Sequence, residues 1–207
     1  SDNFYVYMSF HRRIDAMIYL VRHGESVANV DRRFCGITDV ELSCKGKKQS
    51  LEAGLMLKKE QIDNIYTSPL IRAYDTAKII SEQINVSVEP VACLSEVNFG
   101  IFENMTWDEI QKSYSEESEK WIKQGNGYRF PKGESYDDVL CRIGSFIDNV
   151  EDNSVIVSHF GIIQSILLYL NIADSSTLWD YHISNCDIIA IKSKKIKKIE
   201  EIIKCNI

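Results

Sequence analysis

The stretch Met17-Ile18-Tyr19-Leu20-Val21-Arg22-His23-Gly24-Glu25-Ser26 decides the fold of this chain. Its first five residues form a short apolar run, and a polar segment that contains a glycine follows directly. A run of this length with a glycine-containing turn behind it is typical of a buried strand. The stretch therefore predicts a strand over residues 17–21, whose carboxyl end leads into a loop that carries Arg22 and His23.

Short apolar runs and longer amphipathic runs alternate along the rest of the chain. The expected strands cover residues 17–21, 64–67, 86–91, 154–158 and 187–192. The expected helices cover residues 45–59, 71–83, 107–114, 115–123, 135–150 and 162–170. The tail from Lys192 to Lys204 mixes Lys and Ile in the manner of two edge strands joined by a lysine-rich turn. Strands interleaved with helices predict an α/β fold, a three-layer sandwich with helices on both faces of a mostly parallel central sheet.

The bulk composition fits one globular domain. Of 207 residues, 44% are hydrophobic and 26% are charged, and the formal net charge is -6. We expect a single domain over residues 17–207, preceded at 1–16 by a natural extension or a vector-derived leader. The negative charge argues against nucleic acid as a partner, and no apolar run is long enough to cross a membrane. The six cysteines lack metal-site or redox spacing, which indicates free thiols and a cytoplasmic location.

Polar segments follow three of the expected strands at their carboxyl ends. These segments cover residues 22–26, 67–73 and 158–161. In an open α/β sheet, ligands bind outside the carboxyl ends of the strands. Two arginines and two histidines of these segments, Arg22, Arg72, His23 and His159, can therefore converge on one pocket.

The residue types in this set suit a phosphate ester. An arginine fork matches phosphate oxygens two at a time and keeps its charge. A neutral imidazole is a good nucleophile near pH 7 and needs no strong base to activate it. Gly24 beside His23 and Gly161 two residues after His159 let the backbone come close to a ligand. A lone histidine is more often structural, but the joint occurrence at strand ends favours phosphoryl transfer.

The segment Leu20-Val21-Arg22-His23-Gly24-Glu25-Ser26, followed by Asn29, resembles the signature of the histidine phosphatase superfamily, the phosphoglycerate-mutase-like proteins. Further blocks match in the family's order. They are residues 34–39 with Leu42-Ser43, Gly46 and Gln49; Ser68-Pro69-Leu70 with Arg72-Ala73 and Thr76-Ala77; Leu94-Ser95-Glu96 with Phe99-Gly100 and Phe102-Glu103; Gly133-Glu134-Ser135; and Ser158-His159 with Gly161. The resemblance covers residues 17–185 and is specific as a set. Its departures are small: Asn104 stands where many members have glycine, and Ser43 where threonine is commoner.

The resemblance implies a role for each matching residue. His23 would be the phosphorylated nucleophile, and Glu96 would be the general acid for the leaving oxygen. Arg22, Arg72 and His159 would hold the phosphoryl group. The substrate-binding residues would be Asn29, Ser26, Gly36, Thr38, Arg129 and Lys132. No metal and no cofactor is implied, and the partner is a small phosphorylated substrate. The sequence leaves the oligomeric state open, with a homodimer as one option.

Phosphoryl transfer by this set places conditions on protonation. His23 has to keep one ring nitrogen unprotonated, so we expect a backbone carbonyl to hold its other N–H. A protonated His159 would offset the phosphate charge together with the arginines. Glu96 has to carry a proton, and a nearby phosphate would raise its pKa by like-charge repulsion. Glu25 and Glu103 are the rival candidates for the acid.

The spacing between the blocks bears on the reaction. The mutases of the family carry a long insertion between the acid and the Gly-Glu-Ser block, whereas only residues 97–132 separate them here. Water then reaches the intermediate more easily, which favours hydrolysis over the alternative, a phosphoglycerate mutase. A non-catalytic binding module would have lost the nucleophile or the acid, and both His23 and Glu96 are present.

The substrate is less strongly indicated. The short chain resembles the α-ribazole phosphatases, which act broadly. The segment 128–136 instead resembles the part of fructose-2,6-bisphosphatase that grips a sugar phosphate, and there Arg129 and Lys132 could bind a second anionic group. Phe160 stands where those enzymes carry a substrate-contacting glutamine, so a sugar bisphosphate is the minority interpretation.

Overall fold

The computed structural model describes residues 16–174, 182–194 and 198–205, with side chains up to residue 192. The extension expected at residues 1–16 lies outside this part of the chain, except for Ala16. That residue opens the first strand and pairs with Ser193.

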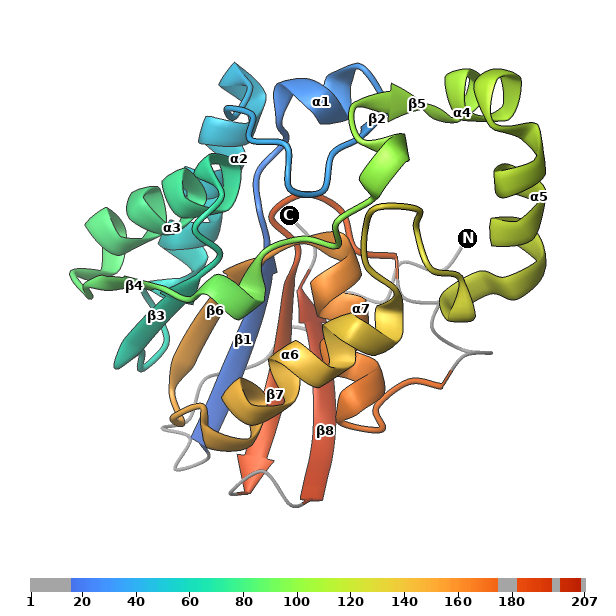
Figure 1. Ribbon diagram of the computed structural model, residues 1–207. Helices are drawn as coiled ribbons and strands as arrows, with labels where there is room; N and C mark the ends of the chain where they lie inside the picture. Colours follow the sequence, from blue (N-terminus) through green and yellow to red (C-terminus); the bar gives the residue numbers. More distant parts are fainter. Residues whose placement is uncertain (1–15, 175–181, 195–197, 206–207) are drawn as a thin grey trace, which may run out of the picture.

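A six-stranded sheet forms the centre of the molecule, in the order β4-β3-β6-β1-β7-β8 (Figure 1). The strands are β1 (Ala16–Arg22), β3 (Asn64–Thr67), β4 (Val88–Pro90), β6 (Ser154–Ser158), β7 (Ile188–Lys194) and β8 (Lys198–Cys205). The first four strands in that order are parallel, and β7 and β8 extend the sheet as antiparallel neighbours. Because β6 lies between β3 and β1, the carboxyl ends of these three strands are adjacent.

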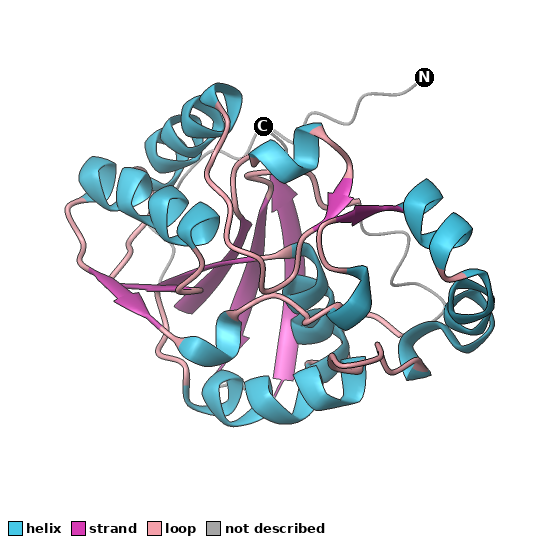
Figure 2. Cartoon of the chain, turned by 45° about the horizontal axis from the view of Figure 1, so that its top comes forward, coloured by secondary structure: helices cyan, strands magenta, loops and turns pink. Residues whose placement is uncertain are grey.

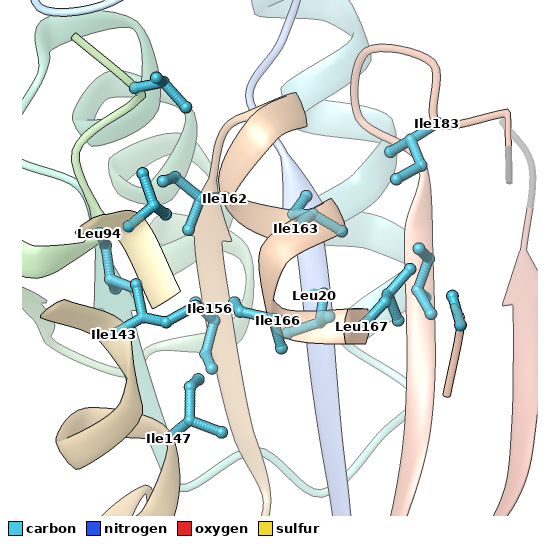
Figure 3. Close-up of a cluster of buried hydrophobic side chains, with 14 of the residues drawn as sticks. Leu20, Leu94, Ile143, Ile147, Ile156, Ile162, Ile163, Ile166, Leu167 and Ile183 are labelled. Carbon is cyan, nitrogen blue, oxygen red and sulfur yellow. The ribbon is translucent and has the colours of Figure 1, made fainter. Parts of the chain in front are cut away.

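Helices cover both faces of the sheet, as the α/β pattern predicts (Figure 2). They are α2 (Cys44–Leu57), α3 (Ile71–Ile84), α6 (Tyr136–Asn149) and α7 (Phe160–Tyr169). On one face, Leu20 and Ile156 pack among isoleucines and leucines of α6 and α7 (Figure 3). On the other face, Val21 and Val157 pack against the buried alanines and leucine of α2 and α3. The strand residues alternate between two cores because neighbouring side chains of a strand point to opposite faces.

Smaller elements lie beyond the carboxyl edge of the sheet (Figure 1). They are α1 (Val27–Val30), β2 (Arg33–Phe34), β5 (Met105–Thr106), α4 (Trp107–Ser113), α5 (Ser115–Gln124) and 3₁₀ turns at Ala92–Leu94, Gly100–Phe102 and Gly125–Gly127. The Trp121 ring anchors α5, with ring centroids 4.9 Å from Phe130 and 5.3 Å from Phe34. This aromatic packing joins α4 and α5 to the loops that approach the edge of the sheet.

The structure confirms the fold class and every helix and strand expected within the described residues. The observed ends of several helices and strands differ from the expected ends by a few residues, in part because capping residues lie outside the helix. Ser135, for example, is the N-cap of α6 rather than its first residue. The edge pair expected in the tail is β7 with β8, and its turn, 195–197, lies outside the described residues. Within the described ranges, no helix is both long and apolar enough to cross a membrane.

Candidate active site

His23 lies immediately after β1 and is only 4% exposed. Its backbone N–H donates to Ser158 O at 2.9 Å, which continues the pairing of β1 with β6. Its Nδ1 lies 2.7 Å from Gly24 O. A carbonyl oxygen only accepts, so Nδ1 carries the proton and Nε2 keeps its lone pair. The expected backbone contact is confirmed, and it leaves the lone pair of the ring on Nε2.

Burial lowers the pKa of His23 well below its ordinary value, and the nearby charges of Arg72 and Arg22 lower it further. The Gly24 hydrogen bond opposes this shift and is a smaller effect. A buried imidazole surrounded by cations stays neutral because a further positive charge would be poorly solvated. His23 is therefore in the state that a nucleophile needs.

His159 lies at the carboxyl end of β6, where it is the N-cap of α7 and fully buried. Its ring centroid is 5.1 Å from that of His23, and its Nε2 lies 2.8 Å from Ser68 Oγ. Its Nδ1 is buried and has no hydrogen-bond partner in the described structure. Burial, then Arg72, His23 and Arg22, lower the pKa of His159 well below its ordinary value. These effects favour the neutral form of His159 in the ligand-free protein. The expectation that His159 is protonated beside a bound phosphate stays a prediction.

Arg72 belongs to the first turn of α3, and 1% of its surface is exposed. Its guanidinium donates to Thr38 O at 3.0 Å, to Cys35 O at 2.9 Å and to Gly36 O at 2.7 Å. These bonds leave part of the five-donor fork unused. One arginine thus holds the loop at residues 35–38 and keeps donors for an anion.

The Glu103 carboxylate binds the backbone N–H groups of the same loop. Its carboxylate accepts from the backbone N–H of Gly36 at 3.2 Å, Ile37 at 3.1 Å and Thr38 at 3.1 Å, and from Phe99 N at 2.9 Å. Gly36 is required by this approach, since an added Cβ would lie 2.0 Å from Val97 O. Gly36 and Thr38 are expected to bind substrate; their backbone N–H groups donate to Glu103, and their substrate role stays a prediction. The carboxylate of Glu103 is likewise committed, which weakens it as the rival acid.

Glu96 follows the 3₁₀ turn at Ala92–Leu94 and is 7% exposed. Its Oε1 accepts from Val97 N at 2.9 Å, and its Oε2 from Gly161 N at 3.2 Å in the first turn of α7. Burial raises the pKa of Glu96, although these two N–H groups and the charges of Arg72 and Arg22 oppose the shift. Burial alone thus favours the protonated acid, without the phosphate that the sequence argument invoked.

The other rival acid, Glu25, points elsewhere. Its carboxylate accepts from Ser43 Oγ at 2.8 Å and from Lys45 Nζ at 2.9 Å. These contacts lower the pKa of Glu25, with the Lys45 hydrogen bond as the largest cause. A carboxylate kept ionised at the surface is a poor proton donor, so Glu96 is the best-placed acid of the three.

Arg22 ends β1 on the side of α7. Its Nη1 donates to Ile183 O at 2.7 Å, and its guanidinium carbon lies 5.4 Å from the centre of the Phe160 ring. Its Nε is buried and has no hydrogen-bond partner in the described structure. Phe160 therefore covers one side of an arginine that keeps an unused donor beside His23.

Ser26 and Asn29 form a capping box at the start of α1, in which each side chain bonds the backbone of the other residue. Asn29 Oδ1 also accepts from Asn185 Nδ2 at 3.1 Å. The same Asn185 amide donates to His23 O at 3.0 Å. Sequence reasoning missed Asn185 because nothing local to it signals a contact with a residue so distant in the chain. Substrate binding by Ser26 and Asn29 stays a prediction.

Arg129 and Lys132 lie apart from the buried cluster. Arg129 pairs with the Asp138 carboxylate at 2.7 Å on the exposed first turn of α6. Lys132 is exposed and has a left-handed backbone, with φ +63°. In the part of the chain that the structure describes, no hydrogen bond or ion pair joins either side chain to the cluster. Their proposed role in binding a second anion stays a prediction.

Five predicted catalytic residues thus form one buried cluster at the carboxyl ends of β1, β3 and β6. They are Arg22, His23, Arg72, Glu96 and His159. The cluster combines an imidazole biased toward its neutral form, two arginines and a carboxyl group biased toward its protonated form. Among the described residues, no group of three or more His, Cys, Asp or Glu side chains is placed to hold a metal ion.

The chain is similar to known proteins in sequence and in fold. The sequence model of the histidine phosphatase superfamily (branch 1) matches residues 18–201. Phosphoserine phosphatase 1 of Hydrogenobacter thermophilus is 31% identical over 195 residues, which is 92% of each chain. A 6-phosphofructo-2-kinase/fructose-2,6-bisphosphatase of Aquarana catesbeiana is 36% identical over 156 residues, 73% of this chain and 32% of that protein. The crystal structure of the α-ribazole phosphatase from Shigella flexneri superposes with a TM-score of 0.78 at 25% identity, over 86% of this chain and 92% of that chain.

Proposed function

Because the chain belongs to branch 1 of the histidine phosphatase superfamily, we propose that it dephosphorylates a small metabolite through a phosphohistidine on His23. The chain is a phosphoric monoester hydrolase of the histidine phosphatase type, in keeping with its phosphatase relatives. The observation that carries the mechanism is the contact of His23 Nδ1 with Gly24 O at 2.7 Å. Gly24 O holds the Nδ1 proton, so Nε2 presents its lone pair inside a cationic cluster.

In the first step, His23 Nε2 attacks phosphorus and the bond from phosphorus to the ester oxygen breaks. Glu96 gives its proton to that oxygen, so the product leaves as an alcohol. Arg22 and Arg72 balance the charge of the phosphoryl oxygens while the group moves. The buried Nδ1 of His159 and Nε of Arg22, which lack partners in the described structure, are further donors for those oxygens.

In the second step, water attacks the phosphorus of the phosphohistidine and the nitrogen–phosphorus bond breaks. Glu96, now ionised, takes a proton from that water and returns to its starting state. His23 regains its neutral form, and inorganic phosphate leaves. The charge is balanced by the protein's own arginines throughout, so we expect full activity in excess chelator.

Release of inorganic phosphate tests this function. We expect the protein to liberate phosphate from phosphomonoesters without a bisphosphoglycerate primer, and His23→Ala to abolish release. His182→Ala is the matched control, because His182 is exposed and belongs to none of the site contacts described above. Strict dependence on the primer would support a mutase instead. Activity that survives His23→Ala, or that chelator removes and magnesium restores, would overturn the mechanism.

We propose a small monophosphate as the substrate, with the phosphoserine and α-ribazole phosphate classes as first choices. Phe160 covers Arg22 where a glutamine would serve a sugar phosphate, and Arg129 is paired with Asp138. A sugar bisphosphate is the second candidate, since exposed Lys132 still offers a cation. A turnover panel with phosphoserine, α-ribazole phosphate, sugar monophosphates and sugar bisphosphates decides between them by kcat/KM.

Location and assembly belong to the same proposal. The five cysteines whose side chains are described are free thiols, which supports the reducing cytoplasm as the compartment. A homodimer is the assembly to test, by light scattering or analytical ultracentrifugation. Because the five residues of the proposed site are close together within one chain, we expect activity per chain to be independent of protein concentration.

A further inference from the structure

The Gly133-Glu134-Ser135 block has no part in the chemical steps above, yet it contacts the loop that carries the acid. Its glutamate pairs with Arg142, two turns into α6, through Arg142 Nε and Glu134 Oε1 at 2.9 Å. The same guanidinium donates to the backbone carbonyls of Cys93, of Ser95 at 2.7 Å and of Glu96 at 3.2 Å. One arginine therefore binds the backbone of the acid itself and of the residues before it.

Glu134 holds the same loop on the far side of Glu96. Its Oε2 accepts from the backbone N–H of Asn98 at 2.9 Å, and its own backbone N–H donates to Asn98 O at 3.0 Å. Gly133 allows this approach, since an added Cβ would lie 2.3 Å from Asn98 O. The Arg142–Glu134 pair thus anchors the backbone on both flanks of the acid.

We propose that Arg142 and Glu134 are positioning residues that set the place of the Glu96 carboxyl group relative to the leaving oxygen. This inference rests on the proposed function, in which Glu96 is the proton donor. Proton transfer demands hydrogen-bond distance, and a misplacement of about 1 Å can cost about 10²-fold in rate. The Glu96 carboxyl is bonded to the neighbouring N–H of Val97, so it moves with the backbone that the pair holds.

A merely structural role is the competing explanation. The two side chains are 23% and 26% exposed, and an ion pair this open to water contributes little to stability by itself. The distinctive feature is the convergence of several backbone bonds on one short loop that carries a catalytic group. A positioning role therefore predicts that substitution slows some substrates more than others. A merely structural role predicts only a change in the amount of folded protein.

The test compares Arg142→Met and Glu134→Gln with wild type on an alkyl phosphate and on nitrophenyl phosphate. An alkoxide needs a proton to leave and a nitrophenolate does not, so only the alkyl reaction depends on a well-placed acid. We expect Arg142→Met to lower kcat for the alkyl ester about 10- to 100-fold and for the aryl ester less than about 3-fold. Arg142→Lys, which can restore one bond but not the fork, should recover only part of the loss.

Arg33→Met is the matched control. Arg33 also donates to a glutamate, Glu109 at 2.8 Å, and to a backbone carbonyl, Asn104 O at 2.7 Å, but has no bond to the segment 93–98. We expect Arg33→Met to leave the alkyl-to-aryl ratio unchanged. If Arg142→Met does not fold, Glu134→Gln keeps the test open, because it preserves size and all the Arg142 bonds to carbonyls.

The double variant with Glu96→Gln shows whether the pair acts through the acid. Once the acid is gone, Arg142→Met should add almost no further alkyl-specific loss. Equal losses on both esters, or an undiminished alkyl-specific loss in the Glu96→Gln background, would overturn the inference. Failure of the proposed function looks different, since it would show in wild type as no phosphate release or as activity that survives His23→Ala.

Discussion

At the scale of single residues, the site contains two buried histidines whose surroundings favour the neutral imidazole. Burial lowers the pKa of each, and the arginines that bind an anion lower both further. The neutral form expected of His23 agrees with its lowered pKa, whereas a protonated His159 is expected only beside a phosphate and stays a prediction. A dianionic phosphate brings the charge that would let His159 take up a proton.

The pKa directions predict the pH profile of kcat/KM, which reports groups of the free enzyme. The pKa of His23 is lowered, so the nucleophile should stay active as pH falls through 6.5. The pKa of Glu96 is raised, so activity should decline only as pH rises through a value above 4.5. We expect Glu96→Gln to flatten the basic limb on an alkyl phosphate. The ionisation of the substrate has to be measured separately. If activity then still falls at low pH with a midpoint at 6.5 or above, and Glu96→Gln does not change that fall, these assignments are contradicted.

Glu96→Gln should also depend on the leaving group. General acid catalysis contributes ~10²–10⁴-fold, so we expect a loss of that size on an alkyl phosphate and a much smaller loss on nitrophenyl phosphate. Glu103→Gln is the comparison. It removes an acceptor from the N–H groups of the loop at 36–38, so it should slow both esters to a similar extent. If Glu103→Gln shows the dependence instead, Glu103 is the acid.

At the scale of elements, the order of the strands explains why distant residues meet. Runs such as Val155-Ile156-Val157 predict buried strands by their composition, and the polar segments behind them predict where a site must lie. Sequence alone could therefore give the elements and the cluster at their ends. Sequence alone could not predict that Glu103 binds the loop at Thr38, 65 residues away. It also could not predict that Asn185 donates to the His23 carbonyl or that Arg142 donates to the Glu96 carbonyl. Each contact forms only because the fold brings distant segments together. The short helix α1 escaped notice for a similar reason, because its caps rather than an apolar pattern define it.

The approach of α7 to the acid loop makes Gly161 a sensitive position. An added Cβ would lie 2.7 Å from Glu96 Oε1 and 2.9 Å from Val97 Cγ2. We expect Gly161→Ala to lower kcat on an alkyl phosphate by about 10-fold or more, because it displaces the carboxyl from the Gly161 N–H. Gly127→Ala, where nothing lies within 4 Å, is the control and should leave kcat unchanged. Full activity of Gly161→Ala would mean that this contact does not hold the acid in place.

At the scale of the whole molecule, the same burial that prepares the site couples stability to pH. Below pH 6.5 an unfolded chain protonates its histidines, while the native state keeps His23 and His159 neutral. The unfolded state then binds more protons, so the free energy of unfolding falls as pH drops. The raised pKa of Glu96 acts in the opposite sense, lowering stability as pH rises above 4.5. We propose that residues 17–207 unfold as one domain when the pH is lowered.

Urea unfolding between pH 7 and pH 5.5 measures this coupling. Each buried neutral histidine should contribute a slope of up to about 1.4 kcal/mol per pH unit below 6.5. We expect the free energy of unfolding of His23→Gln to fall less steeply with decreasing pH than that of wild type, by about that slope. Glu96 contributes equally to both proteins. Parallel stability curves for the two proteins would contradict this, because they would show that His23 has the same pKa in the native and unfolded states.

The central claim is that a phosphoryl group passes through His23, and trapping it is the most direct test. The protein is mixed with substrate labelled in its phosphate, quenched within the first turnover under alkaline conditions, digested and mapped by mass spectrometry. We predict an acid-labile, base-stable label on the peptide that carries His23, bonded through Nε2, and no label in His23→Ala. A label on Ser26, Ser68 or His159, or turnover by His23→Ala, would contradict the account.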